Sequence, residues 1–92
     1  MTLERTVEIV PEAGLHARPA AAFVEAVTDH EAEVSAAKSG EDPVQAGSMI
    51  AVTSLGVGQG DELHLVADGP DAEAVLDELE RILTTPEEEL SA

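Results

Sequence analysis

The spacing of apolar residues predicts two amphipathic helices, one early and one late in the chain. The early helix spans residues 17–28 and is expected to bury Ala20, Ala21, Phe23, Val24 and Val27. The late helix follows Asp71, a residue type favoured as an N-cap, and has an apolar stripe made of Ala72, Val75, Leu76, Leu79, Ile82 and Leu83. Each helix has one face that must pack against another element.

Alternation of polar and apolar residues predicts strands before and between these helices. The expected strands are residues 6–10, 33–37, 43–46 and 62–67, with a hairpin loop at 38–42. Residues 49–55 are expected to form a short helix with Ser48 as its N-cap.

The order of elements is therefore β-α-β-β-α-β-α. Helices in this order cover only one face of the sheet, which predicts a two-layer α+β sandwich. Residues 1–92 are expected to form a single domain, with a frayed acidic tail over about 84–92.

The charge of the chain restricts its partners. Twenty acidic residues against four Lys and Arg give a net charge of −16. Phosphate groups of nucleic acids and anionic membranes would be repelled, and the single aromatic residue, Phe23, argues against stacking on bases. The acidic excess fits either a basic partner or a cytosol of molar salt, in which charge repulsion is screened. Dispersed acids and scarce Lys favour the halophilic interpretation.

Other features of the sequence indicate a cytoplasmic protein. There is no cysteine, so disulfides and thiolate metal sites are excluded. The first residues carry no apolar signal region, and no apolar run is long enough to span a membrane, so no direct membrane insertion is expected.

The segment Gly14-Leu15-His16-Ala17-Arg18-Pro19-Ala20 carries the candidate chemistry. Pro19 falls in the first turn of the early helix, which places His16 at the helix N-terminus. Unpaired backbone N–H groups and the helix dipole favour anions there, and the Arg18 guanidinium offers further donors. This arrangement suggests an imidazole that carries a phosphoryl group rather than one that binds metal.

Two motifs resemble the HPr family, the histidine-containing phosphocarriers of the phosphoenolpyruvate-dependent sugar phosphotransferase system. The first is the segment 14–20, and the second is the serine that opens a short apolar helix before Leu55-Gly56. The resemblance covers nearly the whole chain, from Val7 to about Leu83. It implies an antiparallel four-stranded sheet in the order 1-4-2-3 with three helices on one face.

The resemblance also implies the reaction. Enzyme I would phosphorylate His16 on Nδ1, and the phosphoryl group would pass to the IIA domain of a sugar permease. Backbone N–H groups of Ala17 and Arg18, together with the Arg18 side chain, would stabilise the phosphate. No cofactor or metal is implied. The chain would be a carrier rather than an enzyme in its own right, because it has no nucleotide loop and no substrate pocket.

Further residues have more than one interpretation. Ser48 is either a simple N-cap or a regulatory phosphorylation site. The expected partner-docking surface consists of Ala17, Ala21, Met49, Ile50, Thr53 and Ser54. Basic residues common in the family around that surface are replaced here by Glu25, Thr28, Gly47 and Ala51.

Two alternative functions stay open. One is a regulatory paralogue that signals through its phosphorylation state, and the other is an interaction module that is never phosphorylated.

Overall fold

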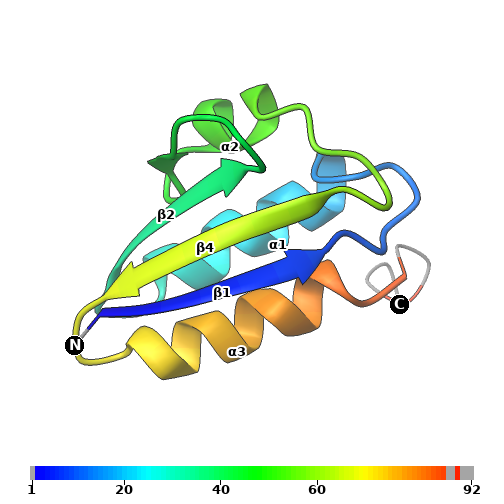
Figure 1. The fold of residues 1–92 in the computed structure, drawn as a ribbon. Coiled ribbons are helices and arrows are strands. Elements are labelled where there is room, and N and C mark those ends of the chain that lie inside the picture. Colours follow the sequence, from blue (N-terminus) through cyan, green and yellow to red (C-terminus); the bar gives the residue numbers. More distant parts are fainter. Residues whose placement is uncertain (1, 87–88, 90–92) are drawn as a thin grey trace.

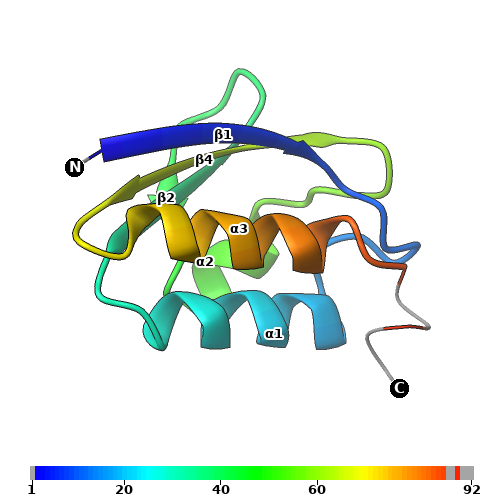
Figure 2. The ribbon, with the colours of Figure 1, turned by 90° about the horizontal axis from the view of Figure 1, so that it is seen from below.

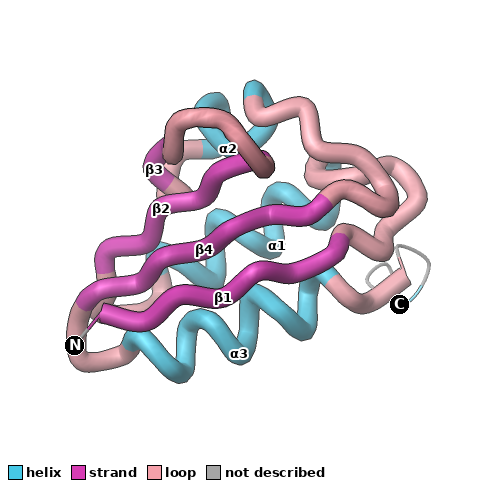
Figure 3. The backbone as a smooth tube through the Cα atoms, in the orientation of Figure 1, coloured by secondary structure: helices cyan, strands magenta, loops and turns pink. Residues whose placement is uncertain are grey.

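The sheet joins strands that lie far apart in the sequence. The computed structural model describes residues 2–86 and 89. Its elements are β1 (Thr2–Glu8), α1 (Ala17–Thr28), β2 (Glu33–Lys38), β3 (Val44–Gln45), α2 (Met49–Ser54), β4 (Glu62–Asp68) and α3 (Ala72–Leu83). The strands form one antiparallel sheet in the order β1-β4-β2-β3 (Figure 1, Figure 3). The predicted order of elements and the expected order of strands are both confirmed.

All three labelled helices lie on the same face of the sheet, as Figure 2 shows. Along β4, the alternate residues Leu63, Leu65 and Ala67 are fully buried beneath the helices. The residues between them face the uncovered side of the sheet. The predicted two-layer α+β architecture is confirmed. No helix within the described residues is long and apolar enough to cross a bilayer.

The core lies between the sheet and the pair α1 and α3. Phe23, the single aromatic residue, has no exposed surface at the centre of α1. On α3, Val75, Leu76 and Leu79 are equally inaccessible. Full burial of such side chains contributes about 1.5–3 kcal/mol each. Ala21 and Val24, expected on the buried face of α1, lie at its margin instead, because Ala21 is exposed and Val24 is half-buried.

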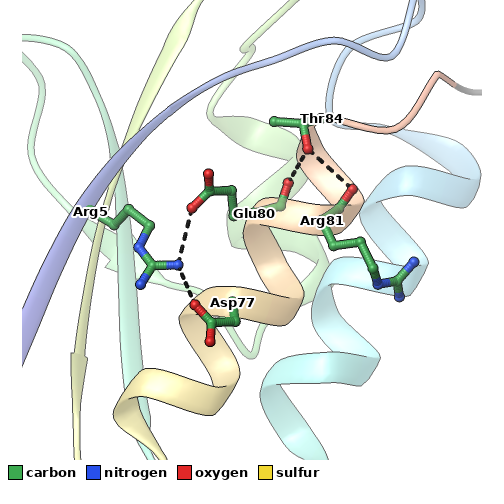
Figure 4. A network of polar contacts seen from close by, with 5 residues as sticks. All are labelled: Arg5, Asp77, Glu80, Arg81 and Thr84. Atoms are coloured by element: carbon green, nitrogen blue, oxygen red, sulfur yellow. Dashed lines mark hydrogen bonds and ion pairs between the residues drawn. The ribbon is translucent and has the colours of Figure 1, made fainter.

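The prediction for the first strand was wrong at both ends. β1 spans Thr2–Glu8, rather than residues 6–10, and pairs with β4 over its whole length. Arg5 lies opposite buried Leu65, on the helix side of the sheet. It therefore places a cation at a position where the alternation calls for an apolar residue. Its guanidinium Nη1 donates to Asp77 Oδ1 at 2.8 Å and to Glu80 Oε1 at 3.0 Å on α3 (Figure 4). The hydrogen bond to Asp77 is the main cause of a raised pKa for Arg5.

Asp71 does not cap α3 with its side chain, contrary to the prediction. It occupies the N-cap position, but its carboxylate forms no capping hydrogen bond. Asp71 Oδ2 instead accepts from the Glu31 N–H at 2.8 Å. The side chain therefore satisfies a donor in the turn after α1, a tertiary contact that local sequence does not encode. β3 is also shorter than predicted, at Val44–Gln45 rather than 43–46.

The residue just beyond the end of α3 is hydrogen-bonded to the last turn of the helix. The Thr84 hydroxyl donates to the Glu80 carbonyl at 2.7 Å (Figure 4), and the Thr84 N–H donates to the same carbonyl at 3.0 Å. The first residue of the predicted frayed tail is therefore ordered against the last helical turn. Residues 87, 88 and 90–92 lie outside the described residues, so the frayed tail stays a prediction there.

Candidate functional site

His16 is the N-cap residue of α1 and is exposed to solvent. Its backbone is extended, with φ −150° and ψ 170°, and its side chain forms no capping hydrogen bond. The imidazole is therefore not used to satisfy the helix N-terminus. The two residues before it, Gly14 and Leu15, are buried, so the histidine projects from a fixed base.

Ala17 has a backbone conformation that is unusual for a residue with a side chain. Its φ is 55°, the single positive value recorded for a non-glycine residue in the described chain. The left-handed region costs an L-residue about 1–2 kcal/mol because Cβ approaches the following carbonyl oxygen. Strain of this kind is found at functional sites, where the surrounding structure enforces it. Here it lies directly next to His16.

The first turn of α1 has two exposed residues followed by two buried ones. Ala17 and Arg18 are exposed, whereas Pro19 and Ala20 are buried against the core. The first N–H groups of a helix have no acceptor within the helix, and they point outward along its axis. The buried pair thus anchors a helix terminus that offers backbone donors and a guanidinium to an anion.

A glycine-rich loop supports the segment that leads to His16. The Leu15 N–H donates to the Val57 carbonyl at 3.2 Å, and the Gly14 N–H donates to the Pro11 carbonyl at 3.0 Å. Gly14 has φ 77°, and a Cβ there would lie 2.5 Å from the Val57 oxygen. Sequence reasoning missed this contact. Its signal was present in the glycine of the motif and in the loop 56–60, which contains three more.

The expected docking residues all lie on the surface of α1 and α2, two helices that pack together. Ala17, Ala21, Met49, Ile50, Thr53 and Ser54 are each exposed. Ile50 keeps 82% of its surface accessible and Met49 keeps 40%, an unusual exposure for large apolar side chains. Ser48, at the start of α2, is half-buried, and its Oγ accepts from the Ala51 N–H at 3.2 Å.

The other two histidines lie outside this site and have partners of their own. His64 points to the uncovered face of the sheet, where its ring nitrogens lie 3.0 Å from Thr6 Oγ1 and 2.9 Å from Glu4 Oε1. His30 Nδ1 lies 2.7 Å from the Ala26 carbonyl oxygen at the end of α1. Both histidines therefore have hydrogen-bonding partners within the fold.

Fold and site together define a small α+β domain that presents a histidine at a helix N-terminus. The family model described as "PTS HPr component phosphorylation site" matches residues 3–85. The phosphocarrier protein HPr of Haloferax volcanii is 57% identical over 86 residues, which cover 92% of this chain and 97% of that protein. HPr of Streptomyces coelicolor is 44% identical over 87 residues, covering 95% of this chain and 94% of that protein.

A solved structure is also similar in fold. The crystal structure of HPr from Bacillus anthracis superposes with a TM-score of 0.84 at 32% identity, covering 89% of this chain and 96% of that one. The chain therefore belongs to the HPr family of phosphocarrier proteins of the phosphotransferase system. The resemblance, the fold and the carrier function expected from the sequence are confirmed. The relative from Haloferax also agrees with the halophilic interpretation.

Proposed function

We propose that His16 is the residue that carries the phosphoryl group, which it accepts from phospho-enzyme I and passes to the IIA domain of a sugar permease in the cytoplasm. The observation that supports this most strongly is the exposed His16 ring, which sits at the N-cap of α1 without making a capping hydrogen bond. The ring is thus accessible to a partner and needs no rearrangement of the helix to react.

The transfer requires a neutral imidazole with a free lone pair. His16 Nδ1 attacks the phosphorus atom of the donor, so that a nitrogen–phosphorus bond forms as the bond from phosphorus to enzyme I breaks. Transfer to the IIA domain repeats this exchange in the opposite role, with His16 as the leaving group. Each step conserves the phosphoryl group and needs no cofactor. Most of the stabilisation of the transition state then comes from the partner protein.

Arg18 and the first backbone N–H groups of α1 stabilise the phosphorylated form. The phosphoryl group adds negative charge at the helix N-terminus, where the N–H groups of Ala17 and Arg18 can donate to its oxygens. The guanidinium of Arg18 is exposed two residues further along and supplies further donors in a fork that matches phosphate. Both contacts are open to solvent, which suits a group that must leave again.

Partners dock on the surface formed by Ala17, Ala21, Met49, Ile50, Thr53 and Ser54. Apolar contact dominates this interface, since Ile50 and Met49 are its largest exposed side chains. In concentrated salt, electrostatic attraction between partners is largely screened, which increases the importance of such contact. We assign Ser48 the role of an N-cap for α2, supported by its hydrogen bond to the Ala51 N–H. Regulatory phosphorylation of Ser48 is the alternative.

The decisive experiment is phosphotransfer from phosphoenolpyruvate and the cognate enzyme I in molar KCl, comparing wild type with His16→Ala. We expect an acid-labile phosphate on wild type alone, which an added IIA domain then removes. Label on neither protein, with both shown to be folded, would favour the interaction module. Label that enters His16 but never reaches an IIA domain would favour the regulatory paralogue. In the same assay, Ser48→Asp slows transfer if charge at that position impairs docking.

A further inference from the structure

One peptide unit contacts both Gly14 and Leu15, the two residues that precede His16. It joins Val57 and Gly58, and its carbonyl oxygen accepts the Leu15 N–H at 3.2 Å. A Cβ on Gly14 would lie 2.5 Å from this oxygen and 2.8 Å from Gly58 Cα. The segment leading to His16 therefore packs backbone against backbone on this unit. In Figure 3 the two loops run side by side at the end of the sheet.

Asp61 holds the other side of the same peptide unit. Its carboxylate Oδ2 accepts the Gly58 N–H at 2.9 Å, and its own N–H donates to the Gly58 carbonyl at 3.0 Å. Because a peptide bond is planar, the Gly58 N–H and the Val57 carbonyl turn together. A carboxylate that fixes the direction of the N–H thus also fixes the direction of the carbonyl that holds Leu15.

We propose that Asp61 is a positioning residue for His16, acting through the Val57–Gly58 peptide and the Leu15 N–H. The inference rests on the proposed function, in which His16 accepts the phosphoryl group. Hydrogen bonds in such a series polarise one another, so the charged carboxylate strengthens the bond to Leu15 as well as its own. A displacement of about 1 Å at a reacting group can cost about 100-fold in rate, so this support affects transfer.

The side-chain oxygen that accepts the Gly58 N–H is the part of Asp61 that this role requires. The Asp61 carbonyl oxygen separately accepts the Ile9 N–H at 2.9 Å, and the Gly60 N–H donates to the Ile9 carbonyl at 2.8 Å. These backbone contacts remain when the side chain is replaced, so β4 keeps its start and the fold is retained. Lys38 Nζ lies 3.8 Å from Asp61 Oδ2, and both side chains are partly exposed. Molar salt screens this ion pair more than it weakens the hydrogen bond.

The test compares Asp61→Ala with Asp61→Asn. Asparagine keeps an oxygen that can accept the Gly58 N–H, whereas alanine does not. We expect phosphorylation of His16 by enzyme I to slow about tenfold or more in Asp61→Ala, and to stay within about twofold of wild type in Asp61→Asn. Amide exchange of Leu15 should accelerate, and the imidazole NMR signals of His16 should shift, in the alanine variant alone. Lys38→Met should resemble Asp61→Asn in molar KCl.

A matched control separates positioning from a general loss of stability. Arg5→Met removes ion pairs between β1 and α3, away from this loop, and serves as a destabilised variant with an intact site. Equal slowing in Arg5→Met and Asp61→Ala would overturn the proposal, as would wild-type rates and His16 signals in Asp61→Ala. Absence of label on His16 in wild type would instead refute the proposed function. The Leu15 exchange rate would still report on the hydrogen bonds in that case.

Discussion

Ala17 combines a side chain with a left-handed backbone directly beside His16, the proposed phosphorylation site. The buried residues on either side, Leu15 and Pro19, hold it there, because each packs in the core and neither can shift without exposing apolar surface. The chain therefore enters α1 by an abrupt change of direction. At this terminus the His16 side chain makes none of the hydrogen bonds to helix N–H groups that an ordinary N-cap side chain makes.

The strain at Ala17 can be measured with a pair of identical substitutions. Ala17→Gly relieves about 1–2 kcal/mol of left-handed strain and loses about 0.4–1 kcal/mol through the more flexible unfolded chain. We expect stability equal to or above that of wild type. Ala21→Gly, at an exposed position inside α1, should lose about 1 kcal/mol. Urea unfolding in molar KCl measures both, and equal losses in the two variants would show that Ala17 is unstrained.

At the scale of elements, Arg5 is the charged link between the edge strand β1 and α3. One guanidinium nitrogen donates to both Asp77 and Glu80, which lie three residues apart and therefore on the same face of α3 (Figure 4). Among the described strands β1 pairs with β4 alone, so its other edge carries no strand, and Arg5 adds a polar contact to the helix layer. A cation at an inward-facing strand position thus replaces the apolar residue that the pattern would predict.

Arg5→Met should lower the free energy of unfolding by about 0.5–2 kcal/mol, the sum expected for two partly exposed ion pairs. Arg81→Met is the matched control, since it makes the same change in net charge. Arg81 is exposed on α3, and no ion pair joins it to another described residue. Thermal unfolding of both variants distinguishes the specific contact from the effect of net charge. The proposed role of Arg5 fails if both melting temperatures fall equally.

Two of the wrong predictions show what local sequence omits. β1 was placed too late because Arg5 breaks the alternation, and its partners Asp77 and Glu80 are more than seventy residues away. Asp71 was assigned a local cap, whereas its carboxylate contacts Glu31 across forty residues. Helix α1 and the position of His16 were predictable because Pro19 and the apolar spacing act within a few turns. The support from Val57 and Asp61 was missed, because the Val57 carbonyl and the Asp61 carboxylate lie in a loop that is distant in the sequence from Leu15.

Net charge acts on the molecule as a whole. The −16 charge is spread over a domain with a radius of gyration of 11.6 Å, so the carboxylates repel one another in the folded state more than in the expanded one. Glu8 and Glu62 lie directly opposite each other on β1 and β4, which adds a local repulsion. At about 1 M salt the screening length is about 3 Å, and both effects nearly vanish.

We therefore expect the melting temperature to rise steeply with KCl concentration and the fold to loosen in low salt. Glu62→Gln should stabilise the protein by about 0.2–1 kcal/mol in low salt, and this gain should disappear in molar KCl. Thermal melts of both proteins across a KCl series provide the measurement. A melting temperature independent of KCl would contradict adaptation to salt. A gain for Glu62→Gln that persists at molar KCl would exclude electrostatic repulsion as its cause.

The strand order has a consequence for synthesis of the chain on the ribosome. β1 is made first, yet its partner β4 begins only at Glu62. Thr2 can therefore pair only after Asp68 has been synthesised. The hydrogen bond from the Leu15 N–H likewise cannot form until Val57 has been synthesised. Contacts of such long sequence separation close late and slowly. A nascent chain that has not yet exposed Val57 and β4 therefore displays the histidine motif without the geometry around it, and phosphotransfer competence arises only when the second half of the domain has emerged.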